Sequence, residues 1–145
     1  MASAEKTMTV DVSSEKLMKV IRDYSRYSEF VVGCGSAKIL KEGTDTEPTR
    51  AEYSIEVMGK KIAYVLDHFP NGENELSWKL VESNLMKENR GGWKLKPLGP
   101  SKTEVTYYVD IEMQFPVPGF VMNTLVKGSL PPMIESFAAQ AKKRG

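Results

Sequence analysis

The stretch KTEVTYYVDIEM, at residues 102–113, carries the clearest structural signal in the chain. Apolar side chains stand at its odd positions, and the even positions are mostly polar or charged, which is the period of a strand with one buried face. A pairing shift of one residue would expose the whole apolar set. The pattern therefore predicts a strand whose inward face is formed by Val105, Tyr107, Val109, Ile111 and Met113.

Segments with the same period precede this strand. We expect further strands over residues 4–12, 36–42, 49–58, 61–69, 74–82 and 86–96. Several connections are short and carry turn-forming residues, as at Gly59-Lys60 and Pro70-Asn71-Gly72. Consecutive strands that are joined by tight turns pair antiparallel, so the sequence predicts an antiparallel meander within a seven-stranded sheet.

Two segments change to a helical period. Apolar residues recur at i, i+3, i+4 and i+7 over 17–24, behind an N-cap at Ser13 or Ser14, and a short helical turn is expected over 26–31. A long C-terminal helix is expected to end at the basic run 142–144, which suits a helix C-terminus. The pair Pro131-Pro132 is expected to kink or restart that helix.

The widths of these elements do not match. Seven strands span roughly 30 Å, whereas one helix is only ~10 Å wide. The sheet must therefore curl around the helix, and space that side chains leave unfilled becomes a cavity. We predict an α+β fold, formed by a single domain over 1–145, in which a curved sheet wraps a long C-terminal helix.

Composition limits the classes of function. The 145 residues include 20 Lys and Arg against 19 Asp and Glu, so nucleic-acid binding is not expected. One cysteine and one histidine exclude an internal disulfide and argue against a metal site, so we expect no metal and a cytoplasmic protein. Residues 1–12 lack a signal-peptide pattern, and the longest uncharged stretch has 14 residues, too short to span a membrane.

Three stretches resemble the START-like helix-grip superfamily (SRPBCC), in particular its polyketide cyclase/dehydrase and coenzyme-Q-binding branch. Residues 22–30, RDYSRYSEF, are similar to the motif D-[FY]-x-x-Y-P-E-F, with Ser28 where proline is usual. The pair GGWKL at 91–95 and KTEVTY at 102–107 is similar to G-x-W … T-x-V-x-Y. The long terminal helix is the third common feature.

This resemblance implies a helix-grip fold with an apolar tunnel and no cofactor. It implies first a binding or carrier protein for a lipid, quinone or polyketide-like molecule. A polyketide cyclase or dehydratase acting on a similar ligand is the alternative, and an interaction module like a ribosome-associating toxin is the second alternative. Members share no catalytic motif, so the resemblance supports the ligand class better than a reaction.

A ligand between sheet and helix would meet mainly apolar walls with few polar groups. Asn89 shares the parity of Trp93 and is expected to face inward, where it either orients a ligand carbonyl or bonds Tyr107. The residues expected to bind the ligand are Tyr53, Ile55, Trp78, Asn89, Trp93, Tyr107, Met133 and Phe137.

The catalytic residues, if any, are unknown from sequence, and His68, Arg90 and Tyr107 are the candidates to polarise a carbonyl. His68 is interpreted as a surface residue at a strand end, because its neighbour Asp67 must point to the opposite face and cannot orient it. Cys34 is interpreted as a small residue in a tight connection.

Residues 115–122, FPVPGFVM, are apolar and stiffened by two prolines. We favour a buried connection between strand and helix. The alternative is a portal lip that makes transient contact with a membrane or a protein.

Overall fold

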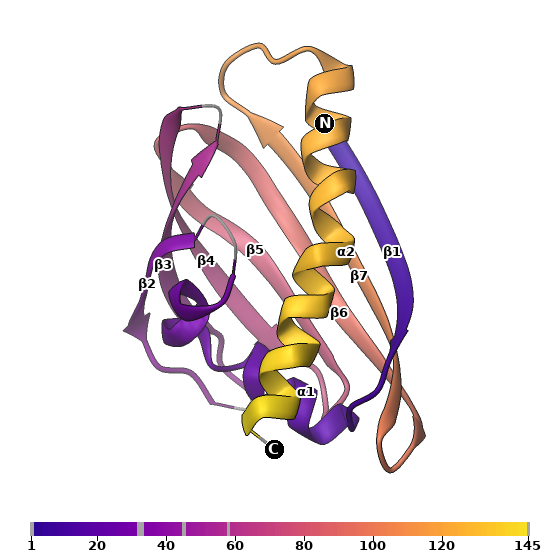
Figure 1. Ribbon diagram of the computed structural model, residues 1–145. Helices are drawn as coiled ribbons and strands as arrows, with labels where there is room; N and C mark the ends of the chain where they lie inside the picture. The colour runs from indigo at the N-terminus through magenta and orange to yellow at the C-terminus, as the bar shows by residue number, and fades with distance from the viewer. Residues whose placement is uncertain (1, 32–33, 45, 58, 145) are drawn as a thin grey trace.

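The chain forms one antiparallel sheet that curves around a long helix (Figure 1). The computed structural model describes residues 2–31, 34–44, 46–57 and 59–144, except for the side chains of 2, 57, 119–126 and 129. In chain order the elements are β1 (Ala2–Val10), α1 (Ser14–Ile21), the 3-10 helix η1 (Tyr24–Glu29), β2 (Cys34–Lys41), β3 (Thr49–Val57), β4 (Lys60–Pro70), β5 (Glu75–Ser83), β6 (Met86–Gly99), β7 (Lys102–Met113) and α2 (Gly119–Arg144).

The strand order is β1-β7-β6-β5-β4-β3-β2, and every neighbouring pair is antiparallel. Six strands thus form the predicted meander, and β1 closes the sheet by pairing with β7, with Ala2 opposite Ile111. This arrangement confirms the predicted helix-grip fold.

Helix α1 and the short helix η1 close one end of the fold. Ser13 caps α1 by accepting a hydrogen bond from the Lys16 backbone N–H. Within the helix, the side chains of Leu17 and Ile21 are fully buried. The predicted second helical turn is present as η1, which begins two residues earlier than expected.

Helix α2 continues through Pro131 and Pro132, so of the predicted kink or restart the restart is wrong. The two prolines cannot donate to the carbonyls of Lys127 and Gly128 one turn earlier. Both of those residues are exposed, so water can bind the freed carbonyls and the helix is not interrupted.

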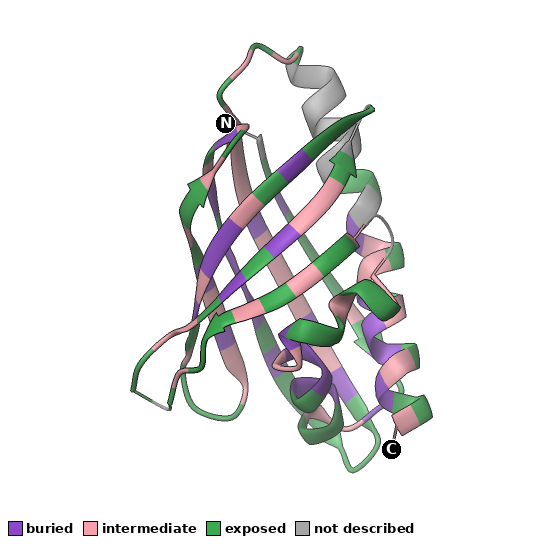
Figure 2. Cartoon of the chain, turned by 90° about the vertical axis from the view of Figure 1, so that its left-hand side faces the viewer, coloured by how far each residue is buried: buried purple, intermediate pink, exposed green. Residues whose placement is uncertain are grey.

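Burial alternates along the strands, as Figure 2 shows. On β7 the predicted inward residues Val105 and Val109 are buried, whereas Tyr107 and Ile111 are only half-buried. Within the described residues, no helix combines the length and apolarity needed to cross a bilayer. The same residues contain no group of three potential metal ligands among His, Cys, Asp and Glu.

Candidate ligand site on the concave face of the sheet

Aromatic rings from four elements meet on the β3 and β4 side of the concave face. Tyr53 on β3 stacks on Tyr64 of β4, with ring centroids 5.4 Å apart, and on Tyr27 of η1, at 5.7 Å. Tyr27 in turn meets Phe137 of α2 edge-on at 5.2 Å. Phe137 therefore joins the short helix η1 to the long helix above the sheet.

The cluster continues across the other half of the sheet. Phe137 lies 4.9 Å from the ring of Trp93 on β6, and Trp93 lies 4.8 Å from Tyr107 on β7. Tyr107 also contacts Trp78 of β5, at 5.3 Å. Five of the eight predicted lining residues thus belong to one continuous cluster, namely Tyr53, Trp78, Trp93, Tyr107 and Phe137.

Asn89 faces inward as predicted, but its partner is not Tyr107. The indole Nε1 of Trp78 donates a hydrogen bond to Asn89 Oδ1 at 3.0 Å. Gly91 stands directly opposite Trp78 in register, and a Cβ there would lie 2.7 Å from the indole ring. The absence of a side chain at Gly91 therefore lets the indole cross β6 and reach Asn89.

His68 is buried with 3% exposure, so its interpretation as a surface residue is wrong. Its Nδ1 lies 3.0 Å from the Thr49 carbonyl, which can only accept, so Nδ1 carries the proton. Nε2 then accepts from the Tyr53 hydroxyl, also at 3.0 Å, and the ring stacks on Tyr24. Burial lowers the pKa of His68 to about 4, and the imidazole is neutral at physiological pH.

As predicted, Asp67 does not orient His68. Its carboxylate binds the Arg50 guanidinium through two hydrogen bonds, of 2.9 and 3.1 Å. Arg90, a sequence candidate for catalysis, bonds Asp110 at 3.3 Å, and its side chain is 58% exposed. Its parity in β6 is opposite to that of Asn89 and Gly91, so Arg90 lies on the convex face, outside the aromatic cluster.

Tyr64 and Tyr107 differ from the other tyrosines of the cluster. No described residue forms a hydrogen bond with either hydroxyl. Neither hydroxyl oxygen belongs to the fully buried polar atoms that lack a partner. Both residues are half-buried, and burial raises the pKa of each phenol well above its ordinary value. Each phenol therefore keeps its proton and can donate it in a hydrogen bond.

The inward residues are not equally covered along the sheet. Toward α1, Leu76 and Val105 are fully buried. Ile55 and Ile111 are half-buried, whereas Ile62 and Asn89, which stand opposite them in register, are buried. The helix residue Met133 is half-buried. The concave face is thus fully packed at Leu76 and Val105 and only partly covered at Ile55, Ile111 and Met133.

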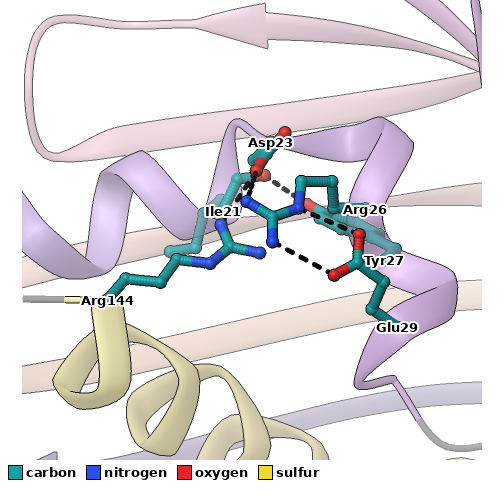
Figure 3. Close-up of polar contacts among 6 residues, drawn as sticks. All are labelled: Ile21, Asp23, Arg26, Tyr27, Glu29 and Arg144. Carbon is teal, nitrogen blue, oxygen red and sulfur yellow. Dashed lines mark hydrogen bonds and ion pairs between the residues drawn. The ribbon is translucent and has the colours of Figure 1, made fainter.

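Polar contacts hold η1 beside the C-terminal end of α2 (Figure 3). Arg144 of α2 binds Asp23 at 2.8 Å, and Arg26 binds Glu29 at 2.9 Å. The Tyr27 hydroxyl donates to the Ile21 carbonyl. These contacts fix the position from which η1 extends its aromatic rings over the sheet.

The sequence interpretation missed the roles of Tyr64, Tyr27 and Phe30 in this cluster. Residues 62–66, IAYVL, are apolar at every position, so the sequence shows no alternation that would tell which way Tyr64 faces. The rings of Tyr27 and Phe30 come from the family-like motif at 22–30, where Phe30 meets Phe137 at 5.0 Å.

Cys34 fits its prediction only in part, and the lip at 115–122 stays a prediction. Cys34 is half-buried and packs against the core at the start of β2, not in a connection. Residues 115–118 alternate between half-buried and exposed, and the side chains of 119–122 lie outside the described residues.

Comparisons with known proteins agree on the family. A sequence model of the family described as polyketide cyclase / dehydrase and lipid transport matches residues 10–138. Ribosome association toxin RatA of Vibrio cholerae serotype O1 is 22% identical over 143 residues, covering 99% of this chain and 97% of that protein.

Solved structures show the same fold. A START superfamily protein from Mycobacterium smegmatis superposes with a TM-score of 0.89 at 20% identity, with both chains fully covered. The Zhui aromatase/cyclase from Streptomyces sp. R1128 gives 0.86 at 14% identity, covering 98% of this chain and 94% of that one.

Proposed function

The chain belongs to the polyketide cyclase/dehydrase and lipid transport family of START-like proteins, and from this we propose that it binds or carries a hydrophobic small molecule. In this proposal the ligand is a lipid, quinone or polyketide-like compound, held between the sheet and α2. We also propose a cytoplasmic location and, as the alternative to a buried connection, a transient membrane or protein contact through residues 115–122.

One observation carries the proposal. The concave face bears a continuous aromatic cluster in which Tyr64 and Tyr107 are half-buried, with hydroxyls that no described residue binds. Ligand sites in proteins are mainly apolar walls with a few placed polar groups. These two tyrosines have that combination, because each ring extends the aromatic wall and each hydroxyl is left for a ligand.

A carrier fits the titratable groups better than an enzyme does. Among the described residues, the buried pair of titratable groups that share a hydrogen bond is Tyr53 and His68. Burial lowers the pKa of His68 and raises that of Tyr53. General acid and base catalysis needs groups whose pKa values lie near the working pH. Burial moves both groups away from neutrality, so this pair supports the structure of the site and not proton transfer.

Ligand titration with two independent signals tests the proposal. Trp78 and Trp93 are the two tryptophans of the chain, and both belong to the cluster. A bound quinone, fatty acyl ester or aromatic polyketide mimic should change their fluorescence and raise the melting temperature. Saturable changes in both signals support the proposal, and the absence of either change across all three ligand classes contradicts it.

The relatives named ribosome association toxin favour a second candidate, an interaction module that binds ribosomes. Co-sedimentation with purified ribosomes distinguishes the two functions. Binding to ribosomes without any small-molecule effect on fluorescence would make this second candidate the better one.

A further inference from the structure

The charge of the concave face restricts the ligand further. Every described side chain that β3 to β7 turn toward α2 is aliphatic, aromatic or uncharged polar, and His68 is neutral. The α2 residues packed on the core are apolar, and segment 119–126, GFVMNTLV, contains no charged residue. Lys6 has the inward parity, but it lies on the edge strand β1 and is exposed.

Two acceptors of this face are already engaged, because Asn89 Oδ1 accepts from Trp78 and His68 Nε2 accepts from Tyr53. Asn89 Nδ2 has only the Met86 sulfur, at 3.6 Å, as a described partner. No described residue binds the hydroxyls of Tyr64 and Tyr107, so these two groups and the Asn89 amide can donate to a ligand.

We infer that the polar group of the ligand is an uncharged hydrogen-bond acceptor, a ketone, ester or quinone oxygen, and that the site rejects carboxylates. This inference rests on the proposed function and adds the charge and hydrogen-bonding character of the ligand. An anion in this place would lose its hydration without gaining a counter-charge. A neutral carbonyl loses far less on leaving water and gains the hydrogen bonds of the two phenols.

A matched set of probes tests the inference by calorimetry on the full chain. The probes are 2-acetylnaphthalene, 2-naphthoic acid and 2-ethylnaphthalene, which share one ring system and differ in the polar group. The Kd of the ketone should stay constant between pH 5.5 and 7.5. The apparent Kd of the acid should rise about 100-fold over that range, since its neutral fraction falls about tenfold per pH unit above its pKa.

Conservative variants locate the contact. Tyr64→Phe and Tyr107→Phe should each weaken ketone binding about fivefold and leave 2-ethylnaphthalene binding unchanged, because only the hydroxyl is lost. Tyr108→Phe is the matched control, since Tyr108 is the next residue along β7 and its ring lies against Gly92 on the convex face. It should change neither affinity.

The outcomes separate the inference from the proposed function. Acid that binds as tightly as ketone at pH 7.5 overturns the inference and leaves hydrophobic ligand binding intact. Equal losses for ketone and hydrocarbon in the Phe variants also overturn it, because they show that the phenols act by packing. Failure of all three probes and of the quinones and lipids to bind overturns the proposed function itself.

Discussion

At the scale of single residues, His68 shows how burial fixes a protonation state. Its pKa is about 4 in the fold and 6.5 ordinarily, so the unfolded chain takes up a proton at a higher pH than the folded one. The contribution of neutral His68 to the free energy of unfolding is therefore fully present above about pH 6.5, and it is lost as the pH falls toward 4. The loss amounts to about 3 kcal/mol.

The variant His68→Gln tests this pH dependence. Glutamine can still donate to the Thr49 carbonyl and accept from the Tyr53 hydroxyl, but it does not titrate. The free energy of unfolding of the wild type, from urea titrations at several pH values, should fall steeply between pH 6.5 and 4. The variant should show a much shallower fall.

Asp67→Asn provides the control for this experiment. The bond to Arg50 lowers the pKa of Asp67, so its contribution is present above its ordinary value of 3.8 and is lost only at more acidic pH. Parallel pH profiles for the wild type and His68→Gln between pH 6.5 and 4 would contradict the assignment of that window to His68.

A second residue-scale prediction concerns Gly91. A Cβ at this position would contact the Tyr108 carbonyl and would lie 2.7 Å from the Trp78 ring. The carbonyl belongs to the sheet and cannot move aside, so Gly91→Ala should cost about 1–3 kcal/mol and change the tryptophan fluorescence. Gly99→Ala in the same strand is the control, because nothing lies within 4 Å of its Cβ position, and it should change neither property.

At the scale of elements, the strands and the existence of the short helix η1 were predictable, and the place where η1 packs was not. The alternation at 102–113 predicted β7 with its observed bounds, because a half-buried strand imposes its period directly on the sequence. The position of η1 depends on contacts with α2 more than 100 residues away, such as the pair Arg144 and Asp23. Local patterns cannot encode such a contact, so the burial of His68 beneath Tyr24 was also missed.

The grip of α2 on the sheet is testable at Phe137. Its ring is 2% exposed and contacts the rings of Tyr27, Phe30 and Trp93. Phe137→Ala should therefore lower the free energy of unfolding by about 3–5 kcal/mol. Glu135→Ala on the exposed side of the helix should change it by less than about 0.5 kcal/mol, and a similar small loss at Phe137 would show that the helix is not held by the sheet.

At the scale of the whole molecule, the two ends of the chain complete the same structure. β1 pairs with β7 across about a hundred residues, and α2 packs on both β1 and α1. This closure was not evident in the sequence, because β1 could have joined either edge of the meander. The alternation of residues along the strands predicts that the concave face is uncharged. The hydrogen bonds that engage Asn89 and His68 could be seen only in the structure.

This closure predicts one cooperative unfolding transition. Since α2, β1 and the central strands share one core, none of them keeps its packing when another is lost. Tryptophan fluorescence reports the strands around Trp78 and Trp93, and far-UV circular dichroism reports the helices, chiefly α2 with its 26 residues. The two signals should give the same urea midpoint.

A ligand at 100 times its Kd should shift both curves together, by about 2.7 kcal/mol, because it binds between the elements that the two signals report. If the helical signal were lost at a lower urea concentration than the fluorescence, α2 would unfold as a separate unit, and a ligand site between helix and sheet would then open without unfolding of the sheet.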